Sequence, residues 1–246
     1  RARIRAGERI LELEGNLNNK NRFLERANER ITESNERMKR ELEAAARIQQ
    51  AFLPDDLPNS PRAKFAWHYE PCEELAGDTL NIIPFDESHV GMYVIDVSGH
   101  GVAAALLSVH LSRILTDLDA ADAYLAKRNE DGSELIIESP TKVAERLNRT
   151  FSFDLSTCQF FTFLYGILDL ESRTFHYTSA GHPGPVVVDE HGRATIHKPT
   201  PPGIGIIPEA RFCARTLKLN HGDRLFLHSD GIFEIDNPKG EELGED

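Results

Sequence analysis

The chain has 246 residues, 40% of them hydrophobic, and its 28 Lys and Arg against 40 Asp and Glu give a formal net charge of −12. This length suits one domain of ordinary size plus an appendage. The composition excludes collagen, a disordered chain and a disulfide scaffold, and the lack of a run of about 18 apolar residues excludes a membrane span in this stretch. Because the sequence begins with Arg1 rather than Met, we expect a fragment of a longer protein, for which an upstream membrane anchor or signal peptide stays an open alternative.

Charge is distributed unevenly along the chain. Residues 1–50 carry 12 basic and 9 acidic side chains, a net of +3, whereas the other 196 residues carry 16 and 31, a net of −15. A domain this acidic repels a phosphate backbone, so we expect no nucleic-acid partner. The cysteines Cys72, Cys158 and Cys213 are far apart and form no CxxC pair, which argues against a disulfide framework or a cysteine zinc site and favours a reducing cytoplasm.

A heptad repeat runs through residues 1–53, which contain no proline. Apolar residues recur at every seventh position: Ile10, Leu17, Leu24, Ile31, Met38, Ala45 and Phe52. A coiled coil needs a second apolar position in each heptad, three or four residues after the first. Here that position is often polar: it includes Lys20 and Ser34 at a spacing of three, and Asn21 and Asn28 at a spacing of four. The pattern predicts a helix about 75 Å long and favours a weak parallel coiled-coil dimer that serves as a signalling linker. The alternative is a solvated helix that lies on its own domain.

The pattern changes at Pro54, where we expect the helix to end and a short proline-rich linker to follow. Short β runs are predicted at residues 64–69, 90–95, 160–168, 174–178, 185–188 and 224–227, with a hairpin turn at 190–193. Helices are predicted at residues 102–118 and 139–151, and the polar residues 119–138 between them are expected to be a surface excursion. Because strands outnumber helices and the hairpins are local, the predicted class is α+β with antiparallel sheets.

Three aspartates stand in a similar setting, each close to a glycine and to a predicted buried strand. Asp78 follows Gly77, Asp96 ends an apolar strand, and Asp230 ends the predicted strand run at residues 225–229 and precedes Gly231. Carboxylate oxygens are the ligands that Mg²⁺ and Mn²⁺ prefer, and two such ions about 3.5–4 Å apart can stabilise an in-line phosphoryl displacement. Any one of the three taken singly is ordinary turn chemistry. The three together favour a metal-binding site.

Five motifs follow one another along the chain: ARIQQAFLP at residues 46–54, AGD at 76–78, DVSGHGVAAAL at 96–106, SAGHP at 179–183 and SDGIFE at 229–234. In this order and spacing they resemble the bacterial sporulation stage II protein E-type serine/threonine phosphatases of the metal-dependent (PPM, type 2C-like) family. The resemblance runs from about Ala46 to the last residue. It implies a PPM-type phosphatase domain at residues 54–246, an antiparallel β-sandwich flanked by α-helices, preceded by the long coiled-coil helix of residues 1–53.

The resemblance also implies roles for individual positions. Asp78 and Asp96 match the family's metal-bridging carboxylates, while the backbone carbonyl of Val97 and the side chain of Asp230 match further metal ligands. It implies two Mn²⁺ or Mg²⁺ ions that activate a water. The implied substrate is a phosphoserine or phosphothreonine protein, typically an anti-sigma-factor antagonist. The coiled coil resembles the linker that joins such phosphatases to an upstream sensor or receiver domain.

Three features depart from the family pattern. The family usually has an Asp-Asp segment on a late strand that supplies another metal ligand, and this sequence reaches Glu245-Asp246 without it, so we expect an incomplete metal site. Ala76 and Asn81 stand where family members commonly have a second glycine and a second aspartate. The excursion at residues 119–138 is longer than the family leads us to expect.

The histidines allow more than one role. His100 lies at a predicted helix N-terminus beside Asp96, where it could protonate a leaving alkoxide. The alternative is a backbone role, since the helix N-terminus lowers the pKa of an imidazole and glycines flank this one. His182 is expected to shape its loop rather than react. Ser98 lacks the GxSxG elbow of serine hydrolases.

Three functions follow from these patterns. The first is a metal-dependent protein serine/threonine phosphatase that is regulated through a dimeric coiled-coil linker. The second is a catalytically inactive phosphatase-fold module that binds a partner. The third is a coiled-coil assembly element, for which residues 55–246 would be inert. Retention of the three aspartates favours the enzyme.

Overall fold

The structure is a computed structural model that describes residues 2–71, 74–118, 120, 122–129, 132, 135–151 and 159–233. Cys72, Cys158 and the pair Glu245-Asp246 therefore lie outside the described residues, whereas Cys213 is exposed and carries a free thiol. The backbone divides into two compact units, Arg1–Ala46 and Arg47–Asp246. Among the helices of the described residues, none combines the length and the apolar character needed to cross a bilayer.

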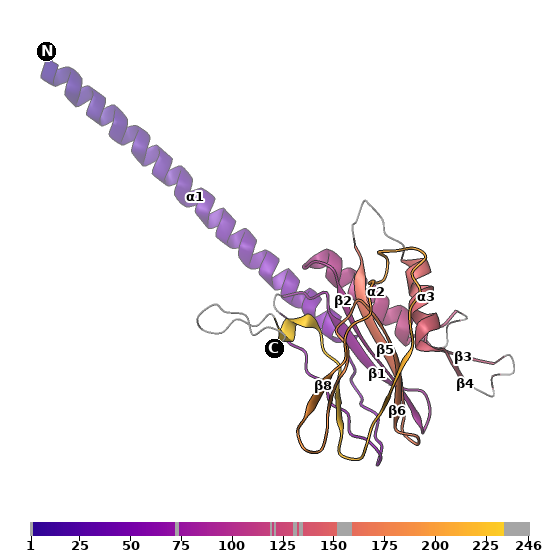
Figure 1. Cartoon of the computed structure of the whole chain (residues 1–246). Helices are drawn as coiled ribbons and strands as arrows, with labels where there is room; N and C mark the ends of the chain where they lie inside the picture. The colour runs from indigo at the N-terminus through magenta and orange to yellow at the C-terminus, as the bar shows by residue number, and fades with distance from the viewer. Residues whose placement is uncertain are drawn as a thin grey trace. The chain divides into compact units, whose positions relative to one another are not determined.

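Helix α1 runs from Ala2 to Gln50 (Figure 1). This confirms the long helix predicted for residues 1–53, although the helix ends three residues earlier. There the backbone N–H groups of Phe52 and Leu53 donate to the carbonyls of Gln49 and Gln50 in tight turns. Along the first unit, heptad side chains from Leu17 to Met38 are 57–62% exposed in the single chain. The dimeric coiled coil stays a prediction.

In the part of the second unit that the structure describes, the strands form three antiparallel sheets. The largest has the order β1-β2-β5-β6-β9, with bounds Thr79–Pro84, His89–Val97, Phe161–Asp169, Thr174–Ala180 and Arg215–Lys218. A second sheet has the order β10-β7-β8, with bounds Arg224–Phe226, Val186–Val188 and Ala194–Ile196. The short strands β3 (Ala126–Arg128) and β4 (Leu135–Ile137) pair with each other. The predicted α+β class with antiparallel sheets is confirmed.

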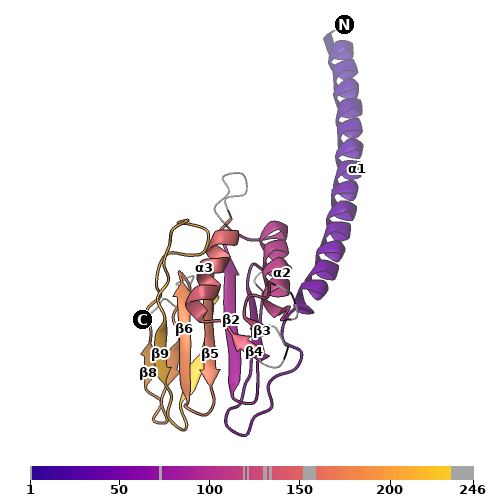
Figure 2. The same cartoon turned by 90° about the vertical axis from the view of Figure 1, so that its right-hand side faces the viewer.

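Strand β2, in the interior of the large sheet, is buried on both faces, and its alternate residues enter two different cores. Tyr93 and Ile95 pack on the side of helices α2 (Val102–Thr116) and α3 (Pro140–Thr150), which cover one face of the large sheet (Figure 2). Met92 packs in the other core, which Leu225 of β10 joins. The period-two alternation of a strand thus separates a helical layer from a second-sheet layer.

Some predicted elements need correction. Residues 64–69 belong to no strand. Two of their side chains form hydrogen bonds with the backbone: Trp67 donates to the Pro54 carbonyl at 3.1 Å, and Tyr69 donates to the Asp78 carbonyl at 3.3 Å. The predicted surface excursion at residues 119–138 contains β3 and β4, and Leu125 is fully buried there. Like β3 and β4, the strands β1, β8 and β9 have no counterpart among the predicted β runs.

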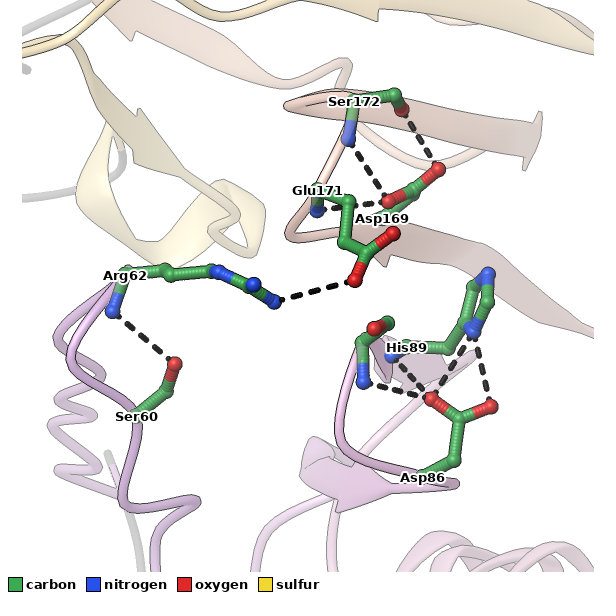
Figure 3. A network of polar contacts seen from close by, with 8 residues as sticks. Ser60, Arg62, Asp86, His89, Asp169, Glu171 and Ser172 are labelled. Atoms are coloured by element: carbon green, nitrogen blue, oxygen red, sulfur yellow. Dashed lines mark hydrogen bonds and ion pairs between the residues drawn. The ribbon is translucent and has the colours of Figure 1, made fainter.

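Side-chain caps fix the turns at one end of the large sheet (Figure 3). In the β1–β2 turn, Asp86 accepts the backbone N–H of His89 at 2.7 Å. In the β5–β6 turn, Asp169 accepts the backbone N–H of Ser172 at 3.0 Å and its hydroxyl at 2.7 Å. Because these caps hold the hairpin registers, they also determine which residues meet at the opposite end of the same strands.

Candidate active site

The strand register brings three polar side chains into line at the end of the large sheet opposite these turns. Thr79 pairs with Ile95, so Asp78, one residue earlier, comes opposite Asp96. Asp96 in turn pairs with Thr162 of β5. Directly opposed residues point to the same face of a sheet. Asp78, one residue before β1, therefore forms one row with Asp96 of β2 and Thr162 of β5, which we call the cross-strand row.

Asp230 approaches this row from the second sheet. The row occupies the β2 face that includes Met92, the side on which Leu225 of β10 packs. Beyond β10 the chain enters the short 3-10 helix Asp230–Ile232. The sequence placed Asp230 at a strand end, but β10 ends at Phe226, four residues earlier.

The neighbouring carboxylates affect the pKa of Asp78. Burial raises the pKa of Asp78 and the charge of Asp230 raises it further, while hydrogen bonds with Ser229 and Asp96 act in the opposite direction. Carboxylates this close resist being ionised together, so a cation between them would relieve their repulsion. Burial, and secondly the charge of Asp78, raises the pKa of Tyr69 to about 12, so its hydroxyl remains a donor to the Asp78 backbone.

The donor set fits a hard cation that keeps water ligands. Among the described residues, no three His, Cys, Asp or Glu side chains form a ready-made metal cage: Asp78 and Asp96 are in contact, whereas Asp230 acts on Asp78 through its charge. Mg²⁺ in particular binds through one or two carboxylates and retains several waters. The Val97 carbonyl faces Gly77 so closely that a Cβ there would stand 2.7 Å from its oxygen. Gly77 thus allows the Asp78 segment to approach β2.

The loop between β2 and α2 carries His100, which is exposed. Its neighbours Gly99 and Gly101 have φ of 86° and 80°, a region that glycine adopts without steric cost. Ser98 fixes the start of this loop on Phe160: its N–H donates to the Phe160 carbonyl at 2.9 Å, and its hydroxyl accepts the Phe160 N–H at 3.0 Å. The acid role of His100 stays a prediction, and the contacts of Ser98 are structural.

Gln49 is a residue of this region whose contact the sequence did not reveal. It is buried at the end of α1, within the second unit. Its Nε2 donates to the Ala76 carbonyl at 2.6 Å and to the Ser108 hydroxyl of α2 at 2.9 Å, and its Oε1 accepts the Ala76 N–H at 3.3 Å. The segment that leads into Asp78 is therefore clamped to two helices. The sequence signal for this contact was a polar residue at a core position of the heptad repeat. A solvent-exposed helix face would explain such a residue equally well.

A second polar contact ties the other side of Asp78 to α2. The hydroxyls of Thr79 and Ser112 lie 2.7 Å apart, and Tyr93 donates to Ser112 at 3.4 Å. Ser108 and Ser112 are one helical turn apart. Consecutive turns of α2 thus hold the chain on both sides of Asp78, at Ala76 through Gln49 and at Thr79 directly.

Comparison with solved structures assigns the fold. The SiaA-PP2C domain of Pseudomonas aeruginosa superposes with a TM-score of 0.64 at 16% identity, over 86% of this chain and 80% of that chain. The RsbU and RsbW domains of Rv1364c from Mycobacterium tuberculosis give a TM-score of 0.52 at 24% identity, over 67% and 42% of the two chains. The fold is that of the PP2C-type phosphatase domains.

Sequence comparison assigns the family. Residues 86–246 match the model of the family described as Stage II sporulation protein E (SpoIIE), so the chain belongs to this family, as the five motifs implied. The phosphoserine phosphatase RsbP of Bacillus subtilis (strain 168) is 28% identical over 200 residues, which cover 80% of this chain and 46% of RsbP. The phosphoserine phosphatase RsbU of the same strain is 23% identical over 205 residues, 82% of this chain and 56% of RsbU. The chain spans about half the length of these curated relatives.

Proposed function

We propose that the second unit is a metal-dependent protein serine/threonine phosphatase. The observation that carries this proposal is the cross-strand row, in which Asp78 and Asp96 meet on one sheet while Asp230 arrives from the other. Family membership and the similarity to two phosphoserine phosphatases support it. The substrate that we propose is a phosphoprotein of the anti-sigma-factor-antagonist type, handled in the reducing cytoplasm that the cysteine pattern favours.

Each residue of the site has a proposed role. Two Mn²⁺ or Mg²⁺ ions, when bound, would supply an activated water and offset the charge of the phosphoryl group. Asp78, Asp96 and the Val97 carbonyl would hold them at the end of the large sheet, and Asp230 from the 3-10 helix that follows β10. His100, exposed in the loop after Asp96, would give a proton to the leaving serine oxygen.

The test is hydrolysis of p-nitrophenyl phosphate and of a phosphoserine peptide with Mn²⁺, with EDTA, and in Asp96→Asn. Outer-shell substitutions at metal sites already cost about 10–100-fold in affinity or activity, so loss of a ligand should reduce turnover by more than about 100-fold. Asp56→Asn, at an exposed aspartate outside the site, is the matched control. Activity that survives both EDTA and Asp96→Asn would refute the phosphatase site. Tight Mn²⁺ binding without turnover would favour the inactive partner-binding module.

We further propose that α1 pairs with a second copy and carries a signal from an upstream sensor or receiver domain. Two observations support this. The heptad side chains from Leu17 to Met38 are exposed in the single chain. Pairing with a second helix would bury this apolar stripe, as in a coiled coil. At the other end of the helix, Gln49 contacts the segment before Asp78. A change in the helix therefore has a direct route to the proposed metal ligand.

A further inference from the structure

His182 lies in the loop after β6, is fully buried and has both ring nitrogens hydrogen-bonded. Its Nε2 lies 2.9 Å from the backbone carbonyl oxygen of His228, and its Nδ1 lies 2.7 Å from the hydroxyl of Thr162. A carbonyl oxygen can only accept, so Nε2 carries the proton, and Nδ1 accepts the proton of the Thr162 hydroxyl. A single neutral tautomer satisfies both bonds, and burial lowers the pKa of His182 to about 3.

The two partners of His182 belong to the two halves of the candidate site. Thr162 is a member of the cross-strand row, directly opposite Asp96. His228 lies two residues before Asp230, on the segment that follows β10. One imidazole thus joins the large sheet to the segment that brings in the third aspartate. Its two bonds span 20 and 46 residues of sequence.

The loop that carries the imidazole is itself held in place. The Ser179 hydroxyl donates to the His182 carbonyl at 2.7 Å. Gly181 has a φ of 71°, and a Cβ at this position would stand 2.8 Å from the backbone nitrogen of Gly203. Because the backbone is fixed on both sides of the ring, the imidazole can hold its partners at a set distance rather than follow them.

We propose that His182 is a positioning residue that sets the place of Asp230 relative to Asp78 and Asp96, and thereby the affinity of the site for a divalent cation. The inference rests on the proposed function for the role of the three aspartates. His182 acts through the His228 carbonyl and the Thr162 hydroxyl and touches none of the reacting groups. A purely structural histidine would affect the stability of the fold and leave cation affinity unchanged.

Two variants separate these roles. In His182→Gln the amide nitrogen reaches the place of Nε2 and keeps a donor for the His228 carbonyl. In His182→Asn the side chain reaches only the place of Nδ1, so the contact with Thr162 stays and the contact with His228 is lost. Both changes replace a buried ring by a smaller amide, so their effects on thermal stability should be similar.

The measurement is Mn²⁺ binding to the whole chain, followed by the electron paramagnetic resonance signal of free Mn²⁺, with thermal unfolding alongside. We expect His182→Asn to weaken binding about 10–100-fold, the range for outer-shell partners of metal ligands, and His182→Gln to retain most of the affinity. Equal affinities in both variants and the wild type, or losses that simply follow the melting temperatures, would overturn the inference.

Thr162→Val provides an independent variant, because it removes the hydroxyl at nearly constant volume and releases the ring from the cross-strand row. Like His182→Gln, it loses the Thr162 contact and keeps the His228 bond, so it should retain most of the Mn²⁺ affinity, and a loss in a folded Thr162→Val as large as that of His182→Asn would also overturn the inference. A wild-type chain that binds no Mn²⁺ would instead refute the proposed metal site, so the two failures are distinguishable.

Discussion

The two flanks of the candidate site are held in different ways. On one flank, Asp78 lies between residues that are bonded to Gln49 and Ser112, on α1 and α2. On the other, the segment before Asp230 is bonded to the buried ring of His182. The first flank is linked to the end of a long helix, and the second is linked to the interior of the sheet structure. We propose that the first flank, at Asp78, responds to a signal from α1, and we call it the responsive flank. The second, at Asp230, gives the site a rigid frame, and we call it the fixed flank.

Acid unfolding tests the fixed flank and should give the largest effect. The pKa of His182 is about 3 in the folded chain against an ordinary 6.5, so below about pH 6.5 the unfolded chain binds a proton that the folded chain does not. Stability therefore falls as the pH drops from 6.5 towards 3, by up to about 1.4 kcal/mol per pH unit.

Urea unfolding midpoints between pH 7 and pH 4 measure this slope. His182→Gln cannot take up the proton and serves as the reference, so the difference between the two curves isolates the imidazole. Parallel curves for the two proteins would mean that the ring is not held neutral in the folded chain.

The responsive flank is tested by Gln49→Leu, for which we expect a moderate effect. The change leaves the N–H and carbonyl of Ala76 without their partner, which should lower the free energy of unfolding by about 1–3 kcal/mol and weaken Mn²⁺ binding. Gln50→Leu, at the exposed neighbouring position of the same helix, is the matched control. If Gln49→Leu and Gln50→Leu bind Mn²⁺ equally, the clamp has no influence on the site.

The difference between the flanks also explains what the sequence could predict. Local patterns sufficed for the long helix, for α2 and α3, and for the apolar strands β2, β5 and β6. They failed at residues 64–69, where β-type residues have no partner strand, and at β1, where Asn81 and the terminal Pro84 interrupt the apolar pattern. Strand propensity describes a residue and its neighbours, whereas a strand needs a partner.

The contacts that build the site depend on long-range pairing. The three aspartates could be singled out from their motifs, but the meeting of Asp78 with Asp96 follows from a register that turn caps set at the far end of the sheet. Gln49 reaches Ser108 across 59 residues, and His182 reaches His228 across 46. Such bonds have no local signature, and so both positioning contacts became visible only in the fold.

The smallest effect on the site should come from the first unit, through Leu24→Gln in the heptad stripe. Leu24 is 62% exposed in the single chain, and loss of a buried leucine from each helix should raise the dissociation constant of a dimer by about tenfold or more. Light scattering across a concentration series measures this, with Glu25→Gln, outside the stripe, as the control. Turnover should change with dimerisation in the wild-type background but not in Gln49→Leu, because that variant has lost the proposed route to Asp78. A change of equal size in both backgrounds would mean that the helix acts on the site by another path, and a molar mass that Leu24→Gln leaves unaltered would remove the dimer from the proposal.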